Sequence, residues 1–231
     1  MASSIDFSHN LSTLQFKNFY SLILIRFEID EYSSGTHVGT HIDAACHFAN
    51  CRWCVDEIPL HRLMSHAAVI DITEKAEKDR DTLVEVQDLL KWEMISGHTL
   101  DGSIVMVRSG WGKRLPDRQA NTGTADFDAS KLHFPGVSKE AAQWLVDNRN
   151  IYGLGIDTLS VDNGISKDTM PHKILYDKNV YGLENVVNLE KIPLYGATIH
   201  AMPMKIGKVV VLLQESWRLF QDILSIMERN E

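Results

Sequence analysis

The sequence predicts a mixed α/β fold in a single domain. Apolar runs at residues 67–72, 103–108 and 151–157 have the length and composition of buried strands. Helices are predicted between these strands, at residues 82–94 and 138–148, because apolar residues recur there at helical spacing. Strands that alternate with helices favour a mixed α/β core over an all-β sandwich. No linker or internal repeat divides the 231 residues, and a content of 44% hydrophobic residues is enough for one large core.

The flanks of these elements carry further signals. Residues 21–29 begin as an apolar run and then alternate, which predicts a half-buried strand. The helix at 82–94 begins with Thr82-Leu-Val-Glu85, which has the form of a capping box. Residues 103–108 lead to a Ser-Gly-Trp-Gly turn, where Trp111 could stand at the mouth of a pocket. Residues 115–134 are polar and are expected to form a long surface loop, either a lid or solvated decoration.

The C-terminal end combines two patterns. Residues 208–213 are an apolar run of strand type. Beyond them, an apolar stripe at helical spacing predicts an amphipathic helix. The stripe consists of Trp217, Phe220, Leu224 and Met227. Such a stripe has to pack against this chain or a partner, and we expect a homo-oligomer.

Composition limits the classes of partner. The net charge is −8 at pH 7, with 31 acidic and 23 basic residues, and no local basic cluster stands out. This charge argues against nucleic acid and against an anionic membrane surface, so a small-molecule ligand is expected. The N-terminus lacks the basic region of a signal peptide, and the apolar run at residues 20–25 is far too short to span a bilayer. We therefore expect a cytoplasmic protein.

Three cysteines, Cys46, Cys51 and Cys54, lie within nine residues. An odd number of cysteines in one short cluster is not a disulfide framework, and we expect reduced thiols. Cys51-x-x-Cys54 also provides half of a zinc knuckle, which His61 and His66 could complete. Reduced thiols are the favoured interpretation of the two.

Four side chains that can bind a metal lie within eleven residues: His37, His41, Asp43 and His47. All four have odd numbers, so an extended chain turns them to one face, whereas a helix would place His41 and Asp43 on nearly opposite sides. A straight strand would separate His37 from His47 by roughly 30 Å, so the chain has to bend. Imidazole and carboxylate together suit zinc, manganese or ferrous iron better than calcium or copper(I). The alternative is a chance cluster of separate surface or core histidines.

The same segment resembles the signature H-x-G-T-H-x-D-x-P-x-H of the metal-dependent cyclase family, which contains bacterial-type kynurenine formamidases and isatin hydrolases. The matching positions are His37, Gly39, Thr40, His41, Asp43 and His47, and Ala45 replaces the proline. The resemblance extends over Asp6-Phe-Ser-His9, residues 105–111, 134–136 and 155–160, His172, Glu184-Asn185 and residues 203–205. Two segments depart from the family. The lead-in before His37 is shorter, and the glycine-rich ending expected after Gly207 is missing.

The resemblance implies a layered β/β/α fold of the swivelling type, with the cyclase-like hydrolase domain at residues 1–207 and a divergent strand and helix at 208–231. It implies five metal ligands, with zinc the first choice of metal and manganese the second. These ligands are His37, His41, Asp43, His172 and Glu184. Asp43 would be able to bridge two ions. His47 would be the general acid and base, and Phe48, Trp53 and Trp111 are expected to contact substrate, although Trp53 also fits a plain core position.

The implied activity is hydrolysis of a small aryl amide. N-formylkynurenine is the favoured substrate, which makes the chain an arylformamidase of tryptophan catabolism. Hydrolysis of a cyclic amide such as isatin asks for the same activated water and is the alternative within the enzyme class. A metal-binding pseudoenzyme or scaffold is the alternative from another class, because both ends of the chain depart from the family.

Overall fold

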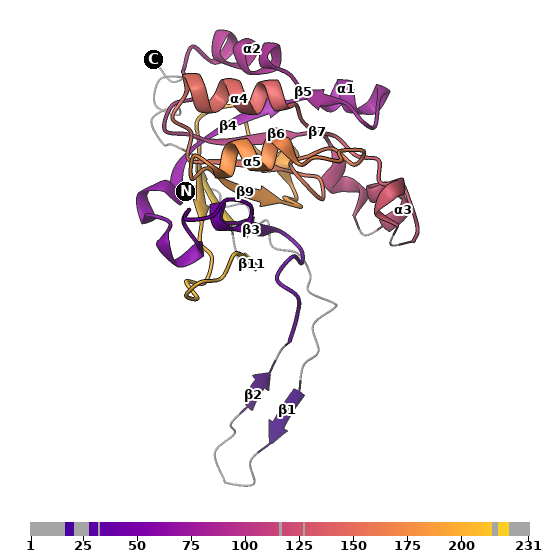
Figure 1. Ribbon diagram of the computed structural model, residues 1–231, viewed down its shortest axis with the longest axis vertical. Helices are drawn as coiled ribbons and strands as arrows, with labels where there is room; N and C mark the ends of the chain where they lie inside the picture. Colours follow the sequence, from indigo (N-terminus) through magenta and orange to yellow (C-terminus); the bar gives the residue numbers. More distant parts are fainter. Residues whose placement is uncertain are drawn as a thin grey trace, which may run out of the picture.

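The computed structural model describes residues 17–20, 28–31, 33–115, 117–126, 128–213 and 217–221. An eight-stranded sheet forms the centre of the molecule, with α2, α4 and α5 stacked on one of its faces (Figure 1). The strand order is β11-β3-β9-β8-β6-β4-β10-β12. Neighbours are parallel from β4 through β6 and β8 to β9, and antiparallel at both ends of the sheet. The mixed α/β class is confirmed.

The strands of the large sheet are β3 (His41–Asp43), β4 (Met64–Asp71), β6 (Ile104–Arg108), β8 (Gly153–Ile156), β9 (Tyr181–Glu184), β10 (Ala197–Ala201), β11 (Val211–Leu213) and β12 (Trp217–Gln221). Two smaller pairs are β1 (Lys17–Tyr20) with β2 (Glu28–Glu31), antiparallel, and β5 (Leu83–Val84) with β7 (Gly136–Val137), parallel. In Figure 1 the pair of β1 and β2 projects away from the main body.

The α-helices are α1 (Thr73–Lys78), α2 (Val86–Ser96), α3 (Arg118–Thr122), α4 (Lys139–Asn148) and α5 (Met170–Tyr176). The 3-10 helices are η1 (Ala45–His47), η2 (Val55–Glu57), η3 (Leu60–Arg62), η4 (Trp111–Arg114), η5 (Ala129–Lys131) and η6 (Leu189–Lys191). Among the described residues, no helix has the length and apolar character that a membrane span requires.

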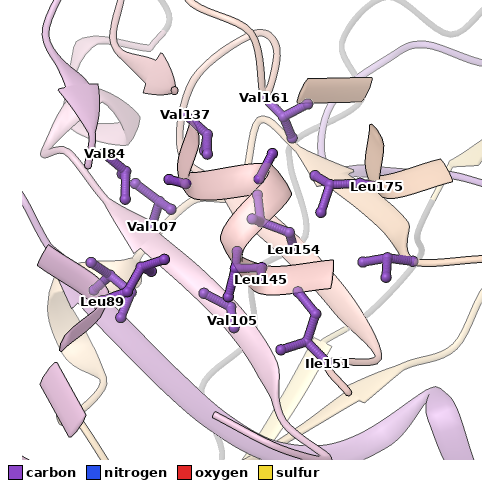
Figure 2. Close-up of a cluster of buried hydrophobic side chains, with 14 of the residues drawn as sticks. Val84, Leu89, Val105, Val107, Val137, Leu145, Ile151, Leu154, Val161 and Leu175 are labelled. Carbon is purple, nitrogen blue, oxygen red and sulfur yellow. The ribbon is translucent and has the colours of Figure 1, made fainter. Parts of the chain in front are cut away.

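The central strand β6 is buried on both faces. Val105 and Val107 belong to the core cluster on the helix side, and Figure 2 shows Val105 beside Leu145 of α4 and Leu89 of α2, and Val107 beside Val84. Ile104 and Met106 belong to a second core cluster on the opposite face of the sheet. A strand buried on both faces reads as a continuous apolar run, which is the pattern seen at residues 103–108. The predicted strands at 67–72 and 151–157 correspond to β4 and β8, shifted by a few residues.

The helix expected at 82–94 begins later than its capping pattern suggested. Leu83 and Val84 form β5 and pair with β7, so the backbone there is extended. The helix α2 starts at Val86, and the capping box is made by Glu85 with Asp88, whose Oδ2 accepts from the Glu85 amide at 2.8 Å. Tertiary strand pairing outweighs the local capping signal. The helix predicted at 138–148 is confirmed, with the Ser138 hydroxyl accepting from the Ala141 amide.

Two other expectations need correction. The stretch at 115–134 is not a plain surface loop, because it contains α3 and η5 and buries Asn121, Thr122 and Thr124. Residues 217–221 form β12 and pair with β10, so no helix begins at Trp217. The rest of that expected helix, like residues 21–27 of the expected N-terminal strand and the segment at Asp6, lies outside the described residues. The segments β11 and β12 both join the large sheet.

Candidate metal centre

The site is built where β3 lies beside β9. His41 and Asp43 alternate along β3 and therefore point to the same face of the sheet. Glu184 at the end of β9 is the register partner of His41, which brings a third ligand to that face. The His41 Nε2 atom lies 3.4 Å from Asp43 Oδ1 and 3.4 Å from Glu184 Oε2.

His37 joins this group from the loop before β3. Gly39 has φ 61, a left-handed conformation that suits glycine, and the chain bends there. The bend brings His37 Nδ1 to 3.2 Å from His41 Nε2 and 3.7 Å from Asp43 Oδ1. His41 Nδ1 donates to the Gly39 carbonyl at 3.0 Å, which leaves Nε2 with a lone pair toward the cluster.

Four ligand atoms, one each from His37, His41, Asp43 and Glu184, lie within 4.8 Å of one another. Asp43 Oδ1 is buried and has no hydrogen-bond partner among the described residues. Burying a carboxylate oxygen without a hydrogen-bond donor costs free energy, and a cation bound at this position would offset that cost. Two nitrogens and two oxygens in this arrangement fit zinc, manganese or ferrous iron. His37 is half exposed, so the site is open to solvent on its side.

His172, the fifth predicted ligand, lies next to this group but is not one of the four in the part of the chain that the structure describes. Its Nε2 lies 3.1 Å from Glu184 Oε1, and its Nδ1 contacts the Asp162 carboxylate. The Val161 amide also donates to Glu184 Oε1, at 3.1 Å. Glu184 is therefore held through Oε1, which leaves Oε2 facing His41.

The charges within the site are distributed unequally. Burial favours protonated Glu184, but hydrogen bonds from His172 and His41 outweigh it and lower the pKa of Glu184 to about 2. Burial and the nearby charge of Glu184 raise the pKa of Asp43 to about 7. Burial opposes a charge on His172 as well, yet the carboxylates of Asp162 and Glu184 raise its pKa to about 9. Asp43 is thus the group at which a proton and a cation compete.

His47 and Phe48 lie beside the ligands, on and just after the single turn η1. The centroid of the His47 ring is 5.0 Å from that of His37, and the ring is half buried. The Phe48 ring lies 4.7 Å from the His47 ring and 4.6 Å from the His172 ring, and Phe48 is 39% exposed. Phe48 therefore presents an aromatic surface to solvent next to the candidate metal centre.

The tryptophans lie elsewhere. Trp111 is 1% exposed, packs with Ala76 and Phe134, and donates from Nε1 to the Asn121 carbonyl at 2.7 Å. The expectation that Trp111 stands at a pocket mouth is wrong, because its side chain is buried against Asn121 of α3 and Phe134. Trp53 is partly buried against the core and lies under the Arg62 guanidinium, which supports its interpretation as a core residue.

The cysteines also require a correction. Cys46 of η1 and Cys54 form a disulfide, and Cys51 is free and exposed. The expectation of three reduced thiols is wrong, and Cys54 is not available for a zinc knuckle with Cys51. Two of the three cysteines pair although their number is odd, because the bend in the backbone after β3 brings Cys46 next to Cys54. The Cys46 amide donates to the Trp53 carbonyl at 3.0 Å in the same turn.

Sequence reasoning missed Tyr176. It is the last residue of α5, it is fully buried, and its ring lies 5.1 Å from that of His172. Tyr176 follows His172 by four residues, so the two side chains lie on one face of a helix. This spacing is the only local signal in the sequence that places Tyr176 near the site. Asp162, by contrast, stood among several aspartates whose spacing could not single it out.

Known proteins resemble this chain in sequence and in fold. The sequence model of a family described as "Putative cyclase" matches residues 5–163. Isatin hydrolase from Roseibium aggregatum is 31% identical over an alignment of 182 positions, which covers 75% of this chain and 68% of the relative. Kynurenine formamidase from Salinibacter ruber is 29% identical over 171 residues, which are 74% of this chain and 70% of the relative. The solved structure of isatin hydrolase A from Ralstonia solanacearum superimposes with a TM-score of 0.84 at 26% identity and covers 94% of this chain and 92% of that one.

Proposed function

This chain belongs to the cyclase family of hydrolases, and on that premise we propose that it is a metal-dependent hydrolase of small aryl amides. The observation that carries the proposal is the group of four ligand atoms within 4.8 Å, flanked by the His47 imidazole. A structural metal site has no use for an additional half-buried base at its side. The divalent ion is zinc by preference, with manganese second.

The ligands would be His37, His41, Asp43 and Glu184. A divalent ion held there supplies Lewis acidity, which makes water a nucleophile at neutral pH and polarises an amide carbonyl. Burial and the neighbouring His37 lower the pKa of His47, so its imidazole is neutral at neutral pH and can accept a proton. His47 would take the proton of the attacking water on a ring nitrogen and return it to the nitrogen of the leaving amine.

The Phe48 ring would stack against the aryl group of the substrate. Aromatic rings prefer offset or edge contacts with one another, and the exposed face of Phe48 is available for such a contact. An aryl amide would then lie with its carbonyl toward the ligand group and its ring toward Phe48. This arrangement suits a cyclic amide of the isatin kind and an aryl formamide equally well.

Of these two substrates, we place the cyclic amide first. Relatives of both kinds match, but the isatin hydrolase has the higher identity, and an isatin hydrolase also shares the fold at a TM-score of 0.84. This reverses the order that the sequence alone favoured, in which N-formylkynurenine came first. Both reactions need the same activated water, so the choice depends on pocket shape.

The test is a spectrophotometric assay of isatin and N-formylkynurenine with the purified protein after loading with Zn²⁺ or Mn²⁺. We expect turnover of at least one substrate, with a higher kcat/KM for isatin, and loss of turnover after chelation. His133→Ala, at an exposed histidine paired with Asp81, is the matched control and should retain activity. A protein that carries stoichiometric metal and turns over neither substrate would instead be a metal-binding scaffold.

A further inference from the structure

Tyr176 carries a polar hydroxyl group, yet its whole side chain is buried. Its side chain is fully buried, and its hydroxyl has no hydrogen-bond partner among the described residues. A buried hydroxyl without a partner is uncommon in a folded protein, since it has given up its bonds to water. The ring is held in place between His172, at 5.1 Å, and Phe48, at 5.9 Å. The hydroxyl is therefore directed by packing on both sides of the ring.

The strand register shows where this hydroxyl lies. Gly182 of β9 is the partner of Asp43 of β3. A Cβ atom added to Gly182 would lie 2.2 Å from the Tyr176 hydroxyl oxygen. Opposite residues of an antiparallel pair have Cβ atoms about 4.5–5.5 Å apart on the same face. The hydroxyl thus occupies the place that a side chain opposite Asp43 would fill.

The Tyr176 hydroxyl therefore lies beside the Asp43 carboxylate, whose Oδ1 has no hydrogen-bond partner among the described residues. A tyrosine phenol keeps its proton at neutral pH, so the Tyr176 hydroxyl can act as a donor. In metal sites, groups that hydrogen-bond to a carboxylate ligand orient it, and their loss typically lowers metal affinity about 10- to 100-fold.

We propose that Tyr176 is a positioning residue, whose hydroxyl donates to the Asp43 carboxylate and holds it in the orientation in which it meets His37 and His41. The inference rests on the proposed function, because it assigns Asp43 as a ligand. Gly182 is part of the same arrangement, since any side chain there would displace the hydroxyl.

The test compares Tyr176→Phe with Tyr181→Phe. Tyr181 is also fully buried, but its hydroxyl donates to the Arg62 carbonyl at 2.8 Å, so it is a matched control with a hydrogen bond of its own. Zn²⁺ affinity is measured by competition with a chromophoric chelator, and Tm is measured with and without the metal. For Tyr176→Phe we expect about 10- to 100-fold weaker Zn²⁺ binding, because the Asp43 carboxylate loses the donor that orients it. For Tyr181→Phe we expect a lower metal-free Tm and unchanged Zn²⁺ affinity.

A second variant tests the position of the hydroxyl. Gly182→Ala should weaken Zn²⁺ binding and lower the metal-free Tm, because the new methyl group clashes with the phenol oxygen. Adding Tyr176→Phe to Gly182→Ala should recover much of the Tm without recovering affinity. Unchanged Zn²⁺ affinity in Tyr176→Phe, or a lower metal-free Tm with unchanged affinity, would overturn the inference. An unmodified protein that binds no Zn²⁺ or Mn²⁺ would instead contradict the proposed function itself.

Discussion

Each histidine of the candidate metal centre has different surroundings, and the surroundings decide what it can do. His41 is 1% exposed and is fixed by the Gly39 carbonyl, so its free nitrogen is directed at the ligand group. His37 is half exposed and completes the group from a loop. His47 stays outside the four ligands but keeps its ring within 5.0 Å of His37. Position thus separates the candidate ligands from the candidate base, although all three are imidazoles.

The replacement His47→Ala tests this distinction. A general acid or base contributes about 10²- to 10⁴-fold in rate, so kcat should fall by that factor while metal content stays unchanged. Elemental analysis and steady-state kinetics on the same preparation measure both quantities. His37→Ala is the comparison variant and should lose metal as well as activity. Loss of metal from His47→Ala would make His47 a ligand, and an unchanged kcat would make it a bystander.

At the scale of elements, the turn η1 after β3 places His47 and Phe48. The chain leaves the sheet at Ala44, turns through Ala45–His47 and is tied to residue 54 by the disulfide of Cys46. Ala45, which replaces the family's proline, is buried in this turn. The disulfide adds a covalent constraint to this turn.

Removing this disulfide should destabilise the protein without emptying the site. In the chain-entropy model, a cross-link across a sequence separation of 8 contributes roughly 2.5 kcal/mol. The double variant Cys46→Ser, Cys54→Ser should therefore lower the free energy of unfolding in urea by about that amount and keep its metal. Cys51→Ser changes an exposed free thiol and should leave stability unchanged. Metal loss in the double variant would contradict the assignment of ligands outside the cysteine cluster.

The helix layer is joined by an ion pair that gives a pH dependence. Glu93 of α2 accepts two hydrogen bonds from Arg149 after α4, both at 2.6 Å. These bonds lower the pKa of Glu93 below its ordinary value of 4.5. Because the pKa is lower in the folded than in the unfolded protein, the stabilisation is present above the ordinary pKa and is lost as pH falls through the lowered one.

Glu93→Gln should accordingly reduce the free energy of unfolding at pH 7 by about 1–3 kcal/mol, the usual range for hydrogen bonds to a charged group. The difference from the unmodified protein should shrink as the pH is lowered below the ordinary pKa of glutamate. Asp147→Asn, at an exposed position of α4, should give no measurable difference at either pH. A pH-independent effect of Glu93→Gln would mean that packing, and not charge, accounts for it.

On the scale of the whole molecule, the candidate metal centre joins segments that are distant in the sequence. It connects β3 and the loop before it to β9, and β9 is in turn held to α5 through His172 and Tyr176. Repulsion between the carboxylates of Asp43 and Glu184 opposes this connection, and a cation bound between them would neutralise it. Metal binding and folding should therefore be coupled.

Chelation of the metal should lower Tm by several degrees. A ligand at 100 times its Kd stabilises the native state by about 2.7 kcal/mol. Hydrogen exchange should localise the loss to β3 and β9, with little change in the central strands β4 and β6. The variant Asp43→Ala should melt at one temperature with and without metal, and a metal-dependent Tm in this variant would contradict the role of Asp43.

The sequence by itself determined the α/β class, the central strands and the candidate ligands near His41. These follow from local patterns, since burial on both faces of a strand gives a continuous apolar run and alternate positions of a strand share a face. The resemblance to a family also pointed to His172 and Glu184, of which Glu184 belongs to the group of four and His172 lies beside it. Their spacing alone carries no signal, because they meet the ligands through strand pairing and helix packing.

Only the tertiary structure decided the rest. The pairing of β3 with β9 makes Glu184 a neighbour of His41, and the same register places the Tyr176 hydroxyl opposite Asp43. Trp111 is a core residue because α3 covers it. The segment at Leu83 is a strand because β7 pairs with it. Cys46 bonds to Cys54 because the chain bends after β3. In each case the contact depends on a distant segment or on a bend of the chain. Such contacts leave no periodic pattern in the sequence from which they could be predicted.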